Sequence, residues 1–182
     1  MLDPVPPEFD PKPGLRKAAV LVTIAERTEG DVLVCTRRHE SMRAHAGQIS
    51  FPGGRRDPGE QPRTTALRET DEEIGVPATR VEVFGAMPAR FSVAGFWVHP
   101  IVGRIPRDHP LTPAEDEVAR IVEFPLRELS EPDCWDLRPP SHGRSTTLLP
   151  HFDYDGEVLW GLTARFVLDL LERSGNPPLP NG

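Results

Sequence analysis

Two runs of β-branched and apolar residues follow one another near the N-terminus, and they restrict the fold more than any other feature of the sequence. Lys17–Arg27 (KAAVLVTIAER) and Asp31–Arg37 (DVLVCTR) are separated by Glu29–Gly30, which predicts two paired strands with a turn at the glycine. Similar patterns recur downstream, and Asp155–Gly156 between the last two predicts a hairpin turn. These further strands are expected at Val81–Ala86, Phe96–Arg104, Val118–Phe124, Leu148–Tyr154 and Glu157–Trp160.

Two helices are expected among the strands. The first covers Pro62–Ile74 and ends before Gly75, and the second covers Leu162–Arg173 with an apolar stripe along one side. Strands interleaved with two helices predict a single domain of the α/β (α+β) class. The chain is expected to divide into a proline-rich N-terminal arm, a domain and a flexible tail, at residues 1–15, 16–174 and 175–182.

Composition restricts the kinds of partner that the protein is expected to bind. The formal net charge of −7 argues against a broad nucleic-acid-binding surface. No apolar run reaches the roughly 20 residues of a membrane-spanning helix, and the N-terminus does not resemble a secretory signal. Cys35 and Cys134 lack metal-ligand spacing, so free thiols in a reduced, cytoplasmic protein are expected. The expected partner is a small molecule, and a monomer and a homodimer both remain open.

The first helix carries an unusual group of acids. Glu69, Glu72 and Glu73 stand at i, i+3 and i+4, so their carboxylates share a helix face, and each like-charge pair should cost roughly 0.2–0.5 kcal/mol. They also lie near the negative end of the helix dipole. A solvated acidic face is one interpretation; the other is a hard cation such as Mg²⁺ or Mn²⁺, for which carboxylates are natural ligands. Arg68 can reach back to orient a carboxylate, and Glu60 lies near the helix start.

The segment Gly54–Val76 (GRRDPGEQPRTTALRETDEEIGV) resembles the Nudix box. The box has a glycine, five residues, a glutamate, seven residues, Arg-Glu, an apolar residue, any residue, Glu-Glu, any residue, a glycine and an apolar residue. Thr70 is the one departure, because the family usually has an aliphatic residue there. The residues in register are Gly54, Glu60, Arg68, Glu69, Glu72, Glu73, Gly75 and Val76.

The resemblance implies a Nudix fold, with a mixed sheet between helices, and a metal-dependent diphosphate hydrolase. It implies that Glu69 and Glu73 bind Mg²⁺ or Mn²⁺, with Glu72 and the carbonyl of Gly53 or Gly54 completing the ligand set. The metal would neutralise the diphosphate and lower the pKa of a bound water, whose proton a carboxylate then receives. Glu69, Glu72 and a downstream acid, best matched by Glu117, are all candidates for that carboxylate; Glu117 is otherwise one exposed acid in a run of three.

Three arginines precede the box in an otherwise acidic chain. Arg37, Arg38 and Arg43 lead directly into the expected metal site. The planar guanidinium fork suits phosphate recognition, so substrate binding is expected here, with a solvated basic loop as the alternative.

The segment Thr36–Gly54 also resembles the signature that precedes the box in coenzyme A diphosphatases. Val34, Cys35 and His39 depart from that signature, whereas Trp160–Glu172 looks like the closing segment of these enzymes. The implied substrate is coenzyme A (CoA) or an acyl-CoA, cleaved to 3′,5′-ADP and 4′-phosphopantetheine. Alternatives are a Nudix hydrolase of ADP-ribose or of a dinucleotide such as NADH, and a non-catalytic nucleotide-binding Nudix module. The matching residues are Thr36, Arg38, Arg43, Gly47, Phe51, Pro52, Gly53 and Gly54.

Overall fold

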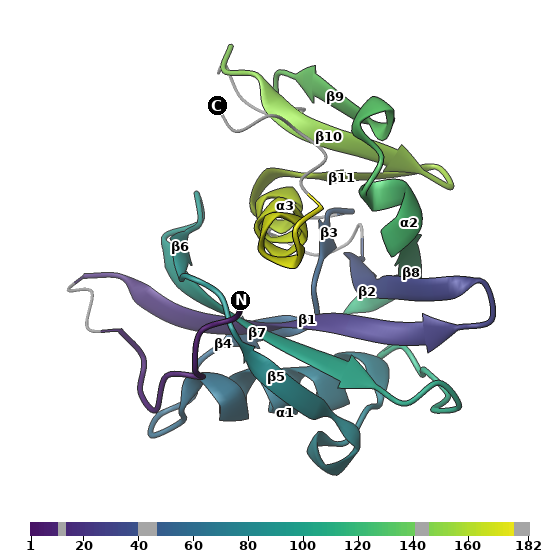
Figure 1. The fold of residues 1–182 in the computed structure, drawn as a ribbon. Coiled ribbons are helices and arrows are strands. Elements are labelled where there is room, and N and C mark those ends of the chain that lie inside the picture. The colour runs from purple at the N-terminus through teal and green to yellow at the C-terminus, as the bar shows by residue number, and fades with distance from the viewer. Residues whose placement is uncertain (11–13, 40–46, 141–145, 177–182) are drawn as a thin grey trace.

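The computed structural model describes residues 1–10, 14–39, 47–140 and 146–176. Figure 1 shows a main sheet with one helix on each face and a small second sheet beyond the upper helix. The strands are β1 (Arg16–Arg27), β2 (Gly30–Arg38), β3 (Ile49–Ser50), β4 (Gly53–Arg55), β5 (Glu82–Ala86), β6 (Arg90–Phe91), β7 (Phe96–Ile105), β8 (Val118–Pro125), β9 (Trp135–Arg138), β10 (Leu149–Tyr154) and β11 (Glu157–Trp160). The helices are α1 (Pro62–Ile74), α2 (Leu126–Leu129) and α3 (Gly161–Ser174), with short 3₁₀ turns at Ala78–Arg80 and Pro132–Cys134.

The main sheet is built on the predicted hairpin. β1 and β2 are antiparallel with Arg27 opposite Gly30, and Gly30 adopts a positive φ of 123° that few other residues tolerate. β1 also pairs in parallel with β7, from Arg16 opposite Phe96 to Ala25 opposite Ile105. The strand order is β3-β2-β1-β7-β5, with β8 on β2, β4 on β1 and β6 on β7. One parallel pair among antiparallel ones makes the sheet mixed.

Apolar side chains cover both faces of this sheet, because successive residues of a strand point to opposite sides. Leu21 and Val34 belong to the cluster that includes Leu67 of α1. Val22 and Leu33 belong to the other cluster, which α3 joins through its own apolar stripe. The predicted mixed sheet between helices is therefore confirmed, and α1 has the predicted bounds Pro62–Ile74.

Several short elements have no counterpart among the predicted ones. β3, β4 and β6 are only two or three residues long, and β9 and α2 have four. Segments of this length are too short to show a hydrophobic period, and pairing to long neighbours defines them instead. β9, β10 and β11 form a separate three-stranded sheet.

The proline-rich arm packs on the domain. The backbone N–H and carbonyl of Asp3 pair with Ala86 at the edge of β5, at 2.9 and 2.8 Å. Phe9 is buried and meets His99 edge-on, with 5.0 Å between the ring centroids. At the other end, Gly175 terminates α3 with a φ of 85°, and the rest of the expected tail from residue 177 lies outside the described residues. In the described part of the chain, no helix is long and apolar enough to cross a membrane.

Candidate active site

The last turn of α1 is covered by the loop between β7 and β8. Gly75 ends the helix in the left-handed region, with φ 71°. The backbone N–H groups of Thr112 and Ala114 donate to the carbonyls of Ile74 and Glu73, each at 3.0 Å. These bonds satisfy carbonyls that a helix end leaves without partners. The same loop then leads to Glu117, so its backbone fixes the downstream acid relative to the acidic helix.

The three helix acids lie in different environments. Glu73 is only 3% exposed, accepts a hydrogen bond from Thr36 Oγ1 at 3.2 Å, and has Arg38 Nη1 at 3.8 Å. Burial raises the pKa of Glu73 to about 8; the Arg38 charge opposes this shift and the Glu69 charge adds to it. Burial also raises the pKa of the half-buried Glu69. The side chain of Glu72 is 59% exposed.

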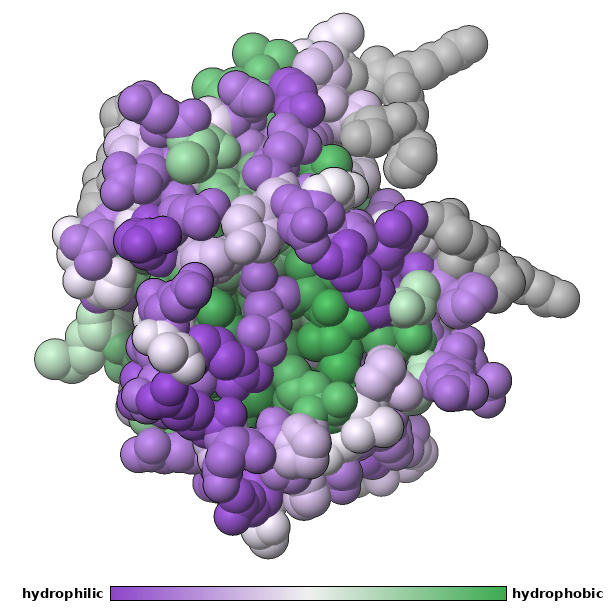
Figure 2. Space-filling view, turned by 90° about the vertical axis from the view of Figure 1, so that its right-hand side faces the viewer, coloured by the Kyte–Doolittle hydropathy of each residue, from purple (hydrophilic) through white to green (hydrophobic). Residues whose placement is uncertain are grey.

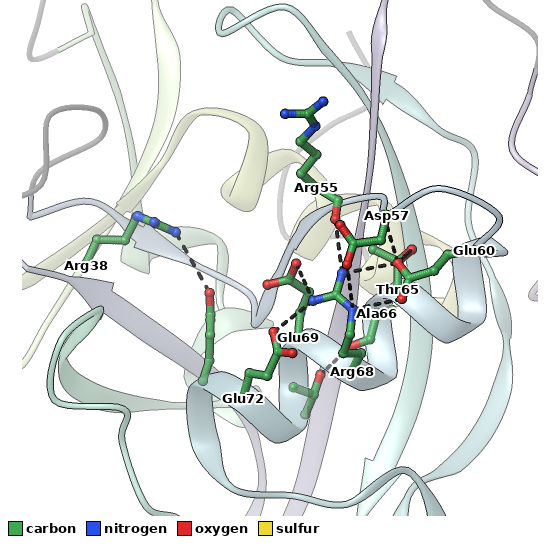
Figure 3. A network of polar contacts seen from close by, with 11 residues as sticks. Arg38, Arg55, Asp57, Glu60, Thr65, Ala66, Arg68, Glu69 and Glu72 are labelled. Atoms are coloured by element: carbon green, nitrogen blue, oxygen red, sulfur yellow. Dashed lines mark hydrogen bonds and ion pairs between the residues drawn. The ribbon is translucent and has the colours of Figure 1, made fainter.

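Arg68 joins these acids to the start of the box. Its Nε donates to Glu60 Oε1 at 2.8 Å and its Nη1 donates to Glu72 Oε2 at 2.8 Å, with Glu69 Oε1 at 3.0 Å (Figure 3). Glu60 also accepts from Thr65 Oγ1 at 2.7 Å. The Arg68 hydrogen bond is the main cause that lowers the pKa of Glu60 to about 2. The prediction that Arg68 reaches back to orient a carboxylate agrees with this geometry.

Glu117 acts on the same group of acids. Its charge raises the pKa of both Glu69 and Glu73, so the three carboxylates are within electrostatic reach of one another. The Glu117 carbonyl accepts from the His39 backbone N–H at 3.1 Å, which ties the downstream acid to the end of β2. The Glu117 side chain itself is exposed.

Gly53 and Gly54 place backbone where no side chain would fit. A Cβ on Gly53 would lie 2.5 Å from the carbonyl oxygen of Ala19, and a Cβ on Gly54 would lie 2.5 Å from both carboxylate oxygens of Glu69. The first obstacle is backbone of β1, whereas the second is the end of a flexible side chain. Glycine at position 54 therefore leaves the space that the Glu69 carboxylate occupies.

The upstream arginines point to opposite faces of β2. Arg38 lies on the α1 side with Glu73, whereas Arg37 forms an ion pair with Glu157 of β11 at 3.2 Å. Glu157 is buried and also pairs with Arg120 at 3.4 Å. The structure thus brings Arg38, and not Arg37, to the acidic helix. No sequence pattern marks Glu157, because its partner Arg37 lies 120 residues away in the chain.

The other predicted substrate-binding positions are spread over the segment before the box. Gly47 turns with a φ of 67° and its N–H donates to the Arg38 carbonyl at 3.1 Å. Phe51 is 2% exposed and packs in the core on the α3 side. Arg43 lies outside the described residues.

A separate pocket of about 440 Å³ opens where the end of β1 and the middle of β8 meet the loop after β7. Figure 2 shows apolar side chains gathered in a hollow near the centre of the face that forms the right-hand side of Figure 1. Arg27 of the pocket is paired with Glu123 at 2.6 Å, and Arg107 with Glu26 at 3.7 Å. Because these charges are paired within the protein and the acids of α1 do not line the pocket, the candidate active site is the acidic helix. The pocket is lined by Arg27, Arg107, Asp108, His109, Leu111, Pro113, Ile121 and Glu123.

A comparison with family models decides the family. The NUDIX domain model matches residues 15–144, which covers β1 through β9 and the whole acidic helix. The chain belongs to the Nudix family. As a Nudix hydrolase it is an enzyme that acts on pyrophosphate bonds, and several relatives in sequence are also named Nudix hydrolases.

One such relative is an uncharacterized Nudix hydrolase, NudL, of Yersinia pestis (strain Pestoides F). It is 39% identical over 162 residues, which are 87% of this chain and 79% of the relative. The Nudix hydrolase RenU of M. smegmatis has a TM-score of 0.60 and 19% identity over 92% of this chain and 90% of its own. The MutT protein of Methanosarcina mazei Go1 has a TM-score of 0.57 and 16% identity over 90% and 99%. These two structures show the shared fold.

Nudix hydrolases generally use Mg²⁺ or Mn²⁺, and the residues present fit such an ion. Among the residues that the structure describes, no three acidic, histidine or cysteine side chains converge as a ready-made metal site, because Arg68 lies between Glu69 and Glu72. The acids are nevertheless hard oxygen ligands. Burial and the charges of Glu69 and Glu117 raise the pKa of Glu73. A nearby cation would therefore stabilise the ionised form of Glu73. Metal binding then requires Glu69 and Glu72 to turn from Arg68.

Proposed function

We propose that this Nudix hydrolase cleaves the diphosphate of CoA and its thioesters, giving 3′,5′-ADP and 4′-phosphopantetheine or its acyl form. The observation that carries the proposal is the contact between two sequence motifs. The segment that resembles the coenzyme A diphosphatase signature supplies Thr36 and Arg38, and both contact Glu73 of the box helix. The signature also supplies Gly54, next to Glu69. The substrate-related motif therefore borders the catalytic one.

Glu69, Glu72 and Glu73, with the carbonyl of Gly53, would hold Mg²⁺ or Mn²⁺. The bound metal supplies charge neutralisation of the diphosphate and Lewis acidity at the attacked phosphorus. Arg68 pairs with Glu69 and Glu72 at 3.0 and 2.8 Å, and both carboxylates would exchange this partner for the metal.

A carboxylate accepts the proton of the attacking water. Glu69, Glu72 and Glu117 are the candidates, and they differ in exposure: Glu69 is half-buried, whereas Glu72 and Glu117 face solvent. Replacing each by Gln and measuring kcat over a range of pH separates them, because removing the proton acceptor lowers kcat and abolishes its rise with pH.

A substrate panel tests the proposed specificity. The kcat/KM of the purified protein with Mg²⁺ should be highest for CoA, and we expect a lower value for both ADP-ribose and NADH. Free CoA, oxidised CoA and acyl-CoA should be compared under the same conditions. Rapid consumption of ADP-ribose or NADH with slow turnover of CoA would contradict the proposal and favour the dinucleotide alternative.

The non-catalytic alternative makes a different prediction. A module that only binds a nucleotide would show no metal-dependent turnover of any diphosphate in the panel. In the proposed enzyme, Glu73→Gln should abolish metal-dependent turnover in a folded protein, since Glu73 is assigned to the metal. Unchanged turnover in Glu73→Gln would remove Glu73 from the ligand set.

A further inference from the structure

A CoA diphosphatase has to bind more anionic charge than its metal can neutralise. CoA carries a 3′-phosphate in addition to its diphosphate, whereas the site is rich in carboxylates. A phosphate away from the metal needs a nearby cation, and arginine is the side chain best suited to it. An arginine that already pairs with a carboxylate of the protein is less available for this role than one without such a partner.

Most arginines around the site have protein partners in the described part of the chain. Arg68 pairs with three box glutamates, and Arg38 with Glu73. Arg37 pairs with Glu157 on the other face of the sheet. Arg56 donates to the Glu60 carbonyl at 3.1 Å and lies over the Phe9 ring.

Arg55 differs from the others. Figure 3 shows its side chain extending away from the carboxylates of α1, and within the described residues its guanidinium makes no hydrogen bond or ion pair. Its backbone, in contrast, is fixed, because its carbonyl accepts from Arg68 Nη2 at 3.1 Å. The protein thus fixes the backbone of Arg55, while no described residue pairs with its guanidinium.

Arg55 also stands next to a residue of the site, because it follows Gly54 in β4. A side chain on Gly54 would point at Glu69, and neighbouring residues of a strand point to opposite sides. Gly53 and Gly54 leave the edge of β4 without side chains. A substrate with its diphosphate at the acidic helix would have to cross this edge to reach the guanidinium on the other side.

We propose that Arg55 is a specificity-determining residue that binds a substrate phosphate outside the hydrolysed diphosphate, which in CoA is the 3′-phosphate. This inference rests on the proposed function. Arg55 stands at one of the five unspecified positions between Gly54 and Glu60, so the box pattern alone gives it no role. Only the structure shows that its guanidinium has no partner among the described residues.

The test compares CoA with dephospho-CoA, which lacks the 3′-phosphate. The wild-type protein should have a KM about tenfold lower for CoA, as one charge-assisted contact provides. In Arg55→Gln the KM for CoA should rise until it is about equal to the KM for dephospho-CoA. Arg55→Lys should restore part of the difference between the two KM values. Arg63→Gln is the matched control, because Arg63 is an exposed arginine of the same box whose guanidinium also has no partner among the described residues. It should retain the wild-type ratio.

Two outcomes overturn the inference in distinguishable ways. If wild-type protein hydrolyses CoA but Arg55→Gln keeps the wild-type KM ratio, or loses equally on both substrates, Arg55 does not read the 3′-phosphate and the proposed function stands. If wild-type protein hydrolyses neither CoA nor dephospho-CoA while consuming ADP-ribose, the proposed function and this inference both fail.

Discussion

Replacing Glu73 by Gln should stabilise the metal-free protein at alkaline pH while removing its activity. Glu73 is buried, and its pKa is raised from 4.5 to about 8 in the folded state. A carboxyl group with a raised pKa binds its proton more tightly in the folded protein, so its contribution to stability is lost as pH rises from about 5 to 8. Glutamine resembles the protonated acid and does not ionise, so it avoids that loss.

The size of the effect follows from the shift. Each pKa unit corresponds to about 1.4 kcal/mol, so a shift of this size gives a few kcal/mol. Since glutamine keeps a carbonyl that can accept from Thr36, we expect the variant and the wild type to be about equally stable at pH 5. At pH 8 in EDTA the variant should be more stable by roughly 2–4 kcal/mol.

Denaturant unfolding in EDTA, followed at several pH values, measures this difference. Glu72→Gln is the control, because the more exposed Glu72 should change the free energy of unfolding by no more than about 0.5 kcal/mol at either pH. Excess Mg²⁺ should then stabilise the wild type and leave Glu73→Gln unchanged. A difference between Glu73→Gln and wild type that does not vary with pH would refute the assignment of a buried, destabilised carboxyl group.

Two further predictions concern the scaffold of the site. Arg68→Gln should lower the free energy of unfolding by roughly 2–3 kcal/mol at pH 7, because it removes the hydrogen bonds to Glu60; the loss should shrink as pH falls from about 4.5 towards 2, where Glu60 becomes protonated. A loss of stability that is the same at pH 7 and near pH 2 would contradict the pairing of Arg68 with Glu60. Gly53→Ala should destabilise the fold, since its Cβ would meet β1 backbone, whereas Gly54→Ala should displace the Glu69 carboxylate and reduce kcat with little change in thermal stability. Equal thermal stabilities of the two alanine variants would argue against the distinction.

The long elements of the fold were predictable because each shows its period over many residues. α1 was predicted at its observed bounds, since Pro62 can start a helix and Gly75 ends it in the left-handed conformation. β1 and β2 were similarly clear. The parallel pairing of β1 with β7 was not predictable, because it depends on contacts between residues 80 positions apart. The packing of Phe9 on the domain was missed for the same reason.

The site was predictable as a set of residue types but not as an arrangement. The spacing of Glu69, Glu72 and Glu73 placed them on one helix face, yet their burial differs because the sheet covers Glu73 and leaves Glu72 to solvent. Arg37 and Arg38 looked equivalent in the sequence. Since adjacent strand residues face opposite sides, the sheet sends only Arg38 to the acidic helix and Arg37 to Glu157.

Product analysis of CoA hydrolysis tests the central claim most directly. The purified protein should be incubated with CoA and Mg²⁺, and the products identified by mass spectrometry. We predict equal amounts of 3′,5′-ADP and 4′-phosphopantetheine, with no product in EDTA or with Glu69→Gln. CoA that stays intact while the same preparation consumes ADP-ribose would contradict the claim.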